Sequence, residues 1–136
     1  MSYALSGPLQ AAVFDAMTND AALAALVGTD IYDAVPAGVL PDTYVRFGRE
    51  SAYDASDGTG AGALHRFIVS VITTVPGFAC AKEAAGAISD VLHNADLTLT
   101  RGRLVSLQFE RAKAARTDAG TTRQIDLQFR ARVQDD

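Results

Sequence analysis

A glycine-rich segment, residues 54–65, is the first part of this sequence whose residue types and spacing could do chemistry. Gly58, Gly60 and Ala63 fit the spacing of a dinucleotide-binding loop. Such a loop needs a helix after it, because the helix N-terminus binds the pyrophosphate. The residues from Leu64 onward instead predict a strand, and no Gly-Lys-Ser/Thr follows as a P-loop would require. We therefore interpret the segment as a solvated, mobile loop between two strands, which orders when a partner docks.

The two histidines and the single cysteine give no catalytic or metal-binding pattern. His65 is expected at a strand start and His93 at a helix end, and neither has a second ligand at metal spacing. Cys80 has no partner for an intrachain disulfide, and we interpret it as a packed thiol. The sequence therefore predicts a protein that is not an enzyme, with no cofactor and no metal. The alternative, which stays open, is a small enzyme or ligand-binding domain that uses the glycine-rich segment and His65.

Length and composition predict one domain over residues 1–136. Hydrophobic residues make up 49% of the chain, enough for a sizeable core. The first residues lack the basic start and apolar run of a signal peptide, and no apolar segment approaches the roughly 20 residues needed to span a membrane. We expect a protein without membrane contact.

Charge is distributed unevenly along the chain. Residues 1–100 carry four basic and eleven acidic groups, whereas residues 101–132 carry eight basic and three acidic groups. This predicts either a solvated basic sheet face or two poles through which copies meet, acid to base. Nucleic-acid binding is the other interpretation of the basic part. Against it, the net charge is −4, and Phe109 and Phe129 are expected on the apolar face, away from the arginines.

The periodicity predicts an α+β fold, mainly an antiparallel sheet with helices packed on one face. Helices are expected at 8–18, from residue 19 or 20 through 27, and at 78–93. Strands are expected at 31–33, 44–49, 64–75, 105–110 and 124–133. The last two alternate strictly, which indicates one buried and one wet face. Residues 112–121 are expected to form a long connection between them.

The order of several short motifs resembles one known family. These are Tyr-Ala-Leu-Ser-Gly-Pro-Leu-Gln-Ala-Ala-Val-Phe near the start, Thr-Gly-Ala-Gly before His-Arg-Phe-Ile-Val-Ser-Val, Gly-Phe-Ala-Cys-Ala-Lys-Glu-Ala-Ala, and the closing Arg-Gln-Ile-Asp-Leu-Gln-Phe-Arg-Ala-Arg-Val. Together they look like the small tail-completion, or tail terminator, proteins of long-tailed phages, closest to members found in gene transfer agents. The resemblance covers nearly the whole chain.

The resemblance implies a structural protein without catalytic residues. Such proteins form a ring, usually of six subunits, that caps the tail tube and joins it to the neck, while DNA passes through without sequence-specific binding. The partners would be further copies of the chain, the tail tube protein and a neck or head-completion protein. The protein would assemble in the cytoplasm of the producing bacterium and end in the tail of the released particle. A head-closure or neck protein of the same particle is the alternative role.

The charge pattern suits a ring, because a closed ring needs two different faces that complement each other. A net acidic protein would also repel DNA phosphate and let it slide. The candidate residues for contact with another subunit or partner come from the glycine-rich segment and the basic last third. They are Asp54, Asp57, Gly58, Gly60, Gly62, Lys113, Arg116, Asp118, Arg130 and Arg132.

Overall fold

The computed structural model describes residues 3–58 and 60–135. Two short 3-10 turns, Tyr3–Leu5 and Asp118–Gly120, accompany the main elements. In chain order these are α1 (Ser6–Thr18), α2 (Ala21–Val27), β1 (Ile31–Tyr32), β2 (Thr43–Asp54), β3 (Ala61–Thr73), α3 (Ala79–Leu92), β4 (Arg103–Thr117) and β5 (Thr122–Asp135).

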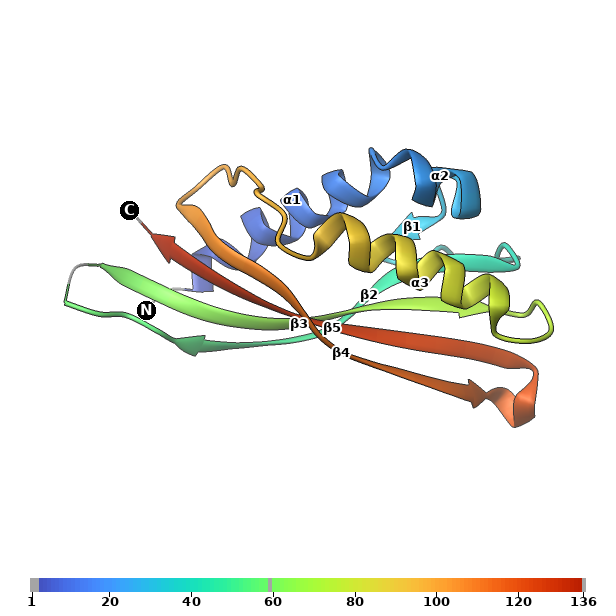
Figure 1. The fold of residues 1–136 in the computed structure, drawn as a ribbon. Helices are drawn as coiled ribbons and strands as arrows, with labels where there is room; N and C mark the ends of the chain where they lie inside the picture. Colours follow the sequence, from blue (N-terminus) through green and yellow to red (C-terminus); the bar gives the residue numbers. More distant parts are fainter. Residues whose placement is uncertain (1–2, 59, 136) are drawn as a thin grey trace.

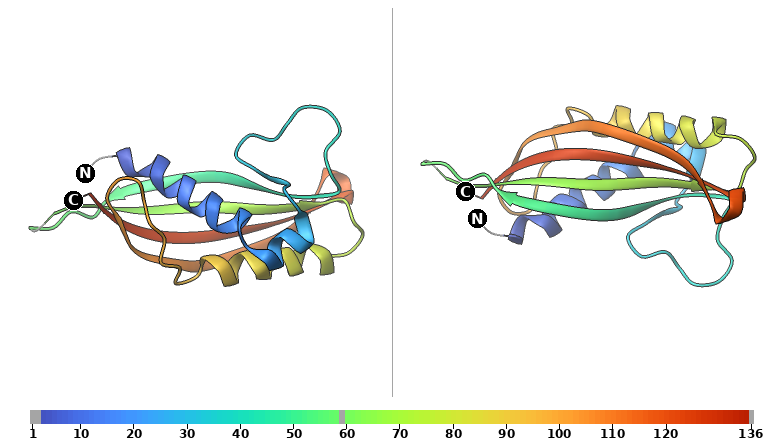
Figure 2. Two further views of the ribbon diagram at one scale, coloured as in Figure 1. Left: turned by 90° about the horizontal axis from the view of Figure 1, so that it is seen from above. Right: turned by 90° about the horizontal axis from the view of Figure 1, so that it is seen from below.

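The molecule has two layers, a twisted five-stranded sheet and three helices on one of its faces (Figure 1). The strand order is β1-β2-β3-β5-β4, and all pairs are antiparallel except β1 with β2. In the right panel of Figure 2, which shows the molecule from below, the strands lie in front of the helices. The prediction of an α+β fold with helices on one face is confirmed, and one sheet face is left open.

The helix α1 forms where the sequence predicts it and begins two residues earlier. Leu9, Val13 and Met17 recur at helical spacing and are fully buried against the sheet. Their burial places α1 across the sheet, beside α3. The neighbouring helix α2 ends at Gly28, whose φ of 60° is a conformation that glycine adopts readily.

The start of α2 is held by Asp20, whose carboxylate accepts a hydrogen bond of 2.9 Å from the backbone N–H of Leu23. Asp20→Ala should lower the free energy of unfolding by about 1 kcal/mol, because a helix N–H loses its acceptor. Asp20→Asn keeps an acceptor oxygen and should stay within about 0.5 kcal/mol of the wild type. Urea denaturation of the three proteins would measure this, and equal losses in both variants would contradict the capping role.

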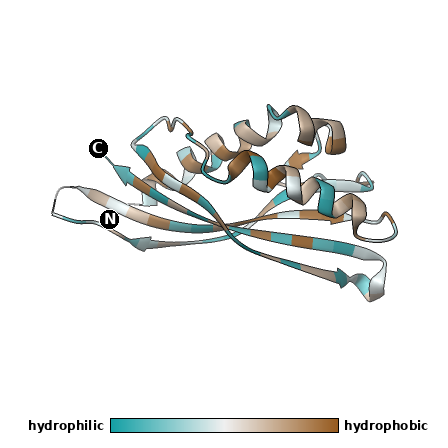
Figure 3. Cartoon of the chain, viewed as in Figure 1, coloured by the Kyte–Doolittle hydropathy of each residue, from teal (hydrophilic) through white to brown (hydrophobic). Residues whose placement is uncertain are grey.

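The core lies between α3 and the helix-facing residues of β3 and β5. Along β5 every second residue from Ile125 to Val133 is buried, so the strand carries alternating hydrophilic and hydrophobic bands in Figure 3. Phe129 is at the centre, its ring 5.6 Å from the ring of Phe67 and 5.9 Å from that of Phe109. The small residues of α3, such as Ala81 and Ala84, are fully buried and let the helix approach the sheet closely.

Three strands are longer than the sequence predicts, and one predicted loop is wrong. β2 continues to Asp54, beyond a bulge between Phe47 and Glu50, because β3 pairs with it along its whole length. The long 112–121 connection is absent: residues 112–117 continue β4, paired with β5, and a tight turn of Asp118, Ala119 and Gly120 closes the hairpin. All three turn residues have positive φ, which makes the reversal short.

In the part of the chain that the structure describes, no helix has the length and apolar character needed to cross a membrane.

Candidate interaction surfaces

The glycine-rich segment forms the tip of the β2–β3 hairpin and projects from one end of the sheet (Figure 1). The backbone N–H of Ala55 donates to the carbonyl of Gly62 at 2.9 Å, and that of Asp57 donates to the carbonyl of Gly60 at 3.0 Å. Asp54 accepts hydrogen bonds from the hydroxyl and backbone N–H of Ser56, which hold the pKa of its carboxyl below the usual value. The tip is therefore a hydrogen-bonded hairpin end rather than a phosphate cradle.

The three glycines of this tip have different surroundings. A Cβ on Gly62 would lie 2.7 Å from the carbonyl oxygen of Ala55, so backbone crowding requires glycine there. A Cβ on Gly60 would meet only the end of the Gln134 side chain, and a Cβ on Gly58 would meet nothing. Neither Gly58 nor Gly62 has a positive φ. Close packing within the hairpin therefore explains Gly62, the exposed Gly58 could take a side chain, and the half-buried Gly60 could do so only if the Gln134 side chain moved.

His65 lies inside the protein and not at a binding site. Its side chain is fully buried on the helix-facing side of β3, with Nδ1 3.4 Å from Oε2 of Glu50. Glu50 also accepts hydrogen bonds from the hydroxyls of Tyr3 and Ser6, the latter at 2.8 Å and 2.9 Å. The serine binds the carboxylate and not the imidazole, so these residues lack the geometry of a nucleophilic triad. They fasten the N-terminal turn and α1 to β2.

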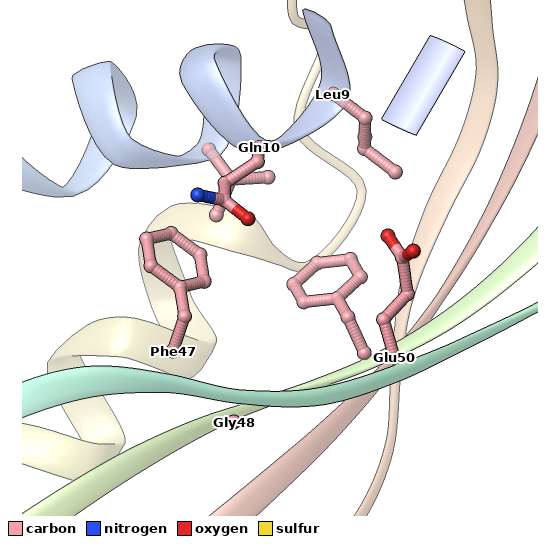
Figure 4. A pocket seen from close by; sticks show the side chains of 7 residues that line it. Leu9, Gln10, Phe47, Gly48 and Glu50 are labelled. Atoms are coloured by element: carbon pink, nitrogen blue, oxygen red, sulfur yellow. The ribbon is translucent and has the colours of Figure 1, made fainter. Parts of the chain in front are cut away.

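A small pocket opens beside Glu50, between α1 and β2 (Figure 4). It is lined by Leu9, Gln10, Val13, Phe47, Gly48, Glu50 and Phe67, and its volume of about 20 Å³ has room for roughly one water molecule. Neither His65 nor any described residue of the glycine-rich tip lines it. Nothing in this geometry favours the alternative of a ligand-binding domain that uses those residues.

His93 and Cys80 have structural positions as well. The ring Nδ1 of His93, directly after α3, accepts a 3.0 Å hydrogen bond from the backbone N–H of Phe109, which ties the helix end to β4. The Sγ of Cys80 lies 3.6 Å from the hydroxyl of Thr43 and is half-buried. Within residues 3–58 and 60–135, no group of three His, Cys, Asp or Glu side chains could hold a metal ion.

The strand β4 is an open edge of the sheet, since it pairs only with β5. From Phe109 to Arg116 its side chains are exposed on both faces, including the small Ala112 and Ala114 on the helix side. A long edge with free backbone groups and small side chains can add a strand or surface from another chain. Lys113 and Arg116 make this edge basic.

The opposite edge is different in shape and charge. β1 covers only Val45 and Arg46 of β2, so no described strand pairs with the outer side of β2 from Phe47 to Asp54. Beside it an open groove of about 350 Å³ runs between α1 and β1, with Phe14, Phe47 and Asp33 among its lining residues. The sheet thus has a basic edge at β4 and, at β2, an edge beside a groove whose lining includes the acidic Asp33.

The open face of the sheet is the fourth surface. It carries basic residues from four strands, among them Arg130 and Arg132 of β5. Of its two acidic residues, Glu110 accepts hydrogen bonds from Gln128 at 2.7 Å and from Arg66 at 3.2 Å. The bonds from Gln128 first, and then from Arg66, hold the pKa of Glu110 below its usual value, so this carboxylate is ionised at neutral pH.

The ten residues predicted as interface candidates fall into four places and do not form one site. Asp54, Asp57, Gly58, Gly60 and Gly62 are at the β2–β3 tip, Lys113 and Arg116 are on the β4 edge, Asp118 is in the β4–β5 turn at the other end of the sheet, and Arg130 and Arg132 are on the open face. Their part in an interface stays a prediction. The sequence reasoning missed the β4 edge, because residues 112–117 lack a strand-like alternation. It also missed five open-face arginines, Arg46, Arg49, Arg66, Arg103 and Arg111.

Among the residues that the structure describes, the candidate functional features of this two-layer α+β fold are surfaces: two unlike open edges, a projecting tip and an open sheet face. Comparisons with known proteins show the class of protein to which it belongs. A family model described as "Tail completion protein gp17" matches residues 11–134. One chain of a solved structure, "Virion of native gene transfer agent (GTA) particle", is 61% identical, with a TM-score of 0.93 over 98% of this chain and 99% of that one. The search of curated proteins found no match.

The chain therefore belongs to the family of tail completion proteins gp17, a family of structural virion proteins. The family resemblance inferred from the sequence motifs is confirmed.

Proposed function

We propose that this chain is the tail terminator of a gene transfer agent particle, where a ring of six copies caps the tail tube and joins it to the neck. DNA would pass through the hole of the ring. The observation that carries the proposal is the 61% identity, over nearly the whole of both chains, to a chain of a gene transfer agent virion. At that identity and coverage the relative's assembly role is the best guide to this one.

The two unlike edges of the sheet support a ring. Copies that join through two different surfaces form a head-to-tail contact, which closes into a ring when the rotation allows. The basic β4 edge, with Lys113 and Arg116, and the groove containing Asp33 are such a pair of surfaces. Their opposite charges would favour the correct orientation of neighbouring copies. The β2–β3 tip and the β4–β5 turn, at the two ends of the sheet, would then contact the tube on one side and the neck on the other.

Ala114→Arg tests the proposal, because it adds a bulky charge to the exposed β4 edge. Ala25→Arg, at an exposed position of α2, is the matched control. Each purified protein would be added to tail tubes from particles that lack this protein, and tube ends would be imaged by electron microscopy. We expect wild type and Ala25→Arg to form six-fold caps and Ala114→Arg to leave the ends bare. Each variant's own stability should change by less than about 0.5 kcal/mol.

Bare tube ends with the wild-type protein would refute the terminator role. The alternative role, head closure, would then be supported if the wild type bound to tailless heads instead. If Ala114→Arg formed normal caps, the terminator role would stand, but the β4 edge would not be part of the interface between copies.

A further inference from the structure

The open face of the sheet concentrates the positive charge of the protein. Eight of the twelve Lys and Arg residues lie on it, against two of the fifteen Asp and Glu residues that the structure describes. The cations are Arg46, Arg49, Arg66, Arg103, Arg111, Lys113, Arg130 and Arg132, and the acids are Glu110 and Asp126. Most of the acidic residues therefore lie elsewhere. The charge of this protein is divided between the two sides of the sheet, which the chain's net charge of −4 conceals.

Several of these cations have no acidic partner. Arg46, Arg49, Arg111 and Lys113 form no ion pair with any residue that the structure describes. Arg66 is paired with Glu110 at 3.2 Å. The second acid, Asp126, accepts hydrogen bonds from the neutral Ser70 at 2.6 Å and Gln124 at 2.8 Å and keeps its negative charge. Positive charges still far outnumber negative ones on this face.

Three other arginines donate to neutral oxygens. Arg103 donates to the side-chain oxygen of Gln134 at 3.1 Å, Arg130 to that of Gln108 at 3.1 Å, and Arg132 to the carbonyl of Ala55 in the glycine-rich tip at 3.3 Å. A guanidinium has five N–H donors, so Arg130 and Arg132 keep donors for a further ligand.

Cations of this face border two adjoining hollows. One of about 120 Å³ has Arg49, Arg111, Lys113 and the acidic Asp126 among its lining residues, and a second of about 230 Å³ has Arg49, Arg66, Tyr53 and the acidic Glu50. The two share three lining residues, Arg49, Ile68 and Gln128.

We propose that the open face of the sheet binds the phosphate backbone of duplex DNA, without sequence preference. The proposal rests on the proposed function, since the ring would bring this face to the DNA. Cross-strand neighbours in a sheet are about 5 Å apart and alternate residues of one strand about 7 Å apart, so the cations form a two-dimensional array of donors. Such an array complements a polymer with regularly repeated charge. Arg and Lys side chains that contact phosphate, and not the edges of bases, bind DNA without reading its sequence.

An acidic protein partner fits this face less well. Stable protein interfaces have a core of buried aromatic and apolar anchors. On β2, β3 and β5, among the described residues, Tyr53 is the one large apolar side chain of this face that is exposed, and the guanidinium of Arg66 covers its ring at 5.7 Å. The expectation that a net acidic chain repels DNA therefore does not apply to this face. Six such faces around one hole would hold DNA through many weak contacts, which still permits sliding.

The test is fluorescence anisotropy of a labelled 30-base-pair duplex, about three helical turns, titrated with protein at several KCl concentrations from 50 to 200 mM. The variant is Arg49→Gln/Arg111→Gln. Its matched control is Lys82→Gln/Arg101→Gln, which removes two exposed cations that lie off the open face, on α3 and before β4. The wild type and control should bind with a steep salt dependence. The variant should bind about tenfold more weakly or worse, with a log–log salt slope shallower by about 2.

An equal loss of DNA affinity in the variant and the control would overturn the proposal. So would a wild-type protein that does not bind the duplex at 50 mM KCl. Competition by polyglutamate as effective as competition by unlabelled DNA would also overturn it, in favour of an acidic protein partner. The tube-capping assay, run on the same preparations, separates this inference from the proposed function. Bare tube ends refute the ring, whereas capped tubes without DNA binding refute only the phosphate surface.

Discussion

Phe129→Ala should lower the free energy of unfolding by about 3–5 kcal/mol, among the largest effects of any single substitution in this chain. The side chain is fully buried on β5, the strand flanked by β3 and β4, and its ring contacts Phe67 on one side and Phe109 on the other. Truncation removes apolar burial and two aromatic contacts and leaves a cavity that β3 and β4 cannot close without shifting. Most domains have only 5–15 kcal/mol of stability in total.

Thermal denaturation would measure this effect. At about 4 °C per kcal/mol, the midpoint should fall by roughly 12–20 °C. Val105→Ala is a suitable control, since it shortens an apolar side chain on the neighbouring strand that is already 44% exposed, and it should change stability by less than about 0.5 kcal/mol. A loss below 1 kcal/mol for Phe129→Ala would mean that the three rings are not the centre of the core.

Gly102→Ala should be the second large effect, a loss of about 2–4 kcal/mol. Gly102 precedes β4 with a φ of 65°, a conformation that side chains other than glycine rarely adopt. A Cβ there would lie 2.5 Å from the carbonyl oxygen of Gln134 and 3.0 Å from the side chain of Leu5. Both the backbone conformation and the contact with β5 therefore oppose any larger residue.

Gly86→Ala is the matched control, because Gly86 is exposed in the middle of α3 and its Cβ would meet nothing. It should stabilise the protein by about 1 kcal/mol through helix propensity. Urea denaturation of both variants measures the pair. If the Gly102→Ala protein were as stable as the wild type, β4 must be able to shift to admit the methyl group. The close approach of residue 102 to Gln134 and Leu5 would then not require glycine.

In the proposed ring, different parts of one small sheet have different tasks. The two edges would join copies, the β2–β3 tip and the β4–β5 turn would reach the neighbouring components, and the open face would meet DNA. Each task has its own substitutions, so a failure in one assay identifies the surface responsible. Ala114→Arg addresses the edge, and Arg49→Gln/Arg111→Gln addresses the face.

The sequence by itself determined the elements with strong local signals. Leu9, Val13 and Met17 recur with the period of a helix, and residues 124–133 alternate with the period of a strand, because burial on one face imposes those periods. It also excluded the dinucleotide loop, since a strand follows the glycines. Family membership could be inferred from the order of its motifs, and the comparisons confirm it.

Only the tertiary structure decided how far the strands extend and which charges share a surface. Residues 112–117 have no alternation because both of their faces are exposed, so only pairing with β5 makes them a strand. Arg49 and Arg111 are 62 positions apart in the chain, yet they line the same hollow, since β3 and β5 bring β2 and β4 into one sheet. Local sequence patterns record which face of an element is buried. They do not record which strands become neighbours, and that pairing places most of the basic residues on a single face.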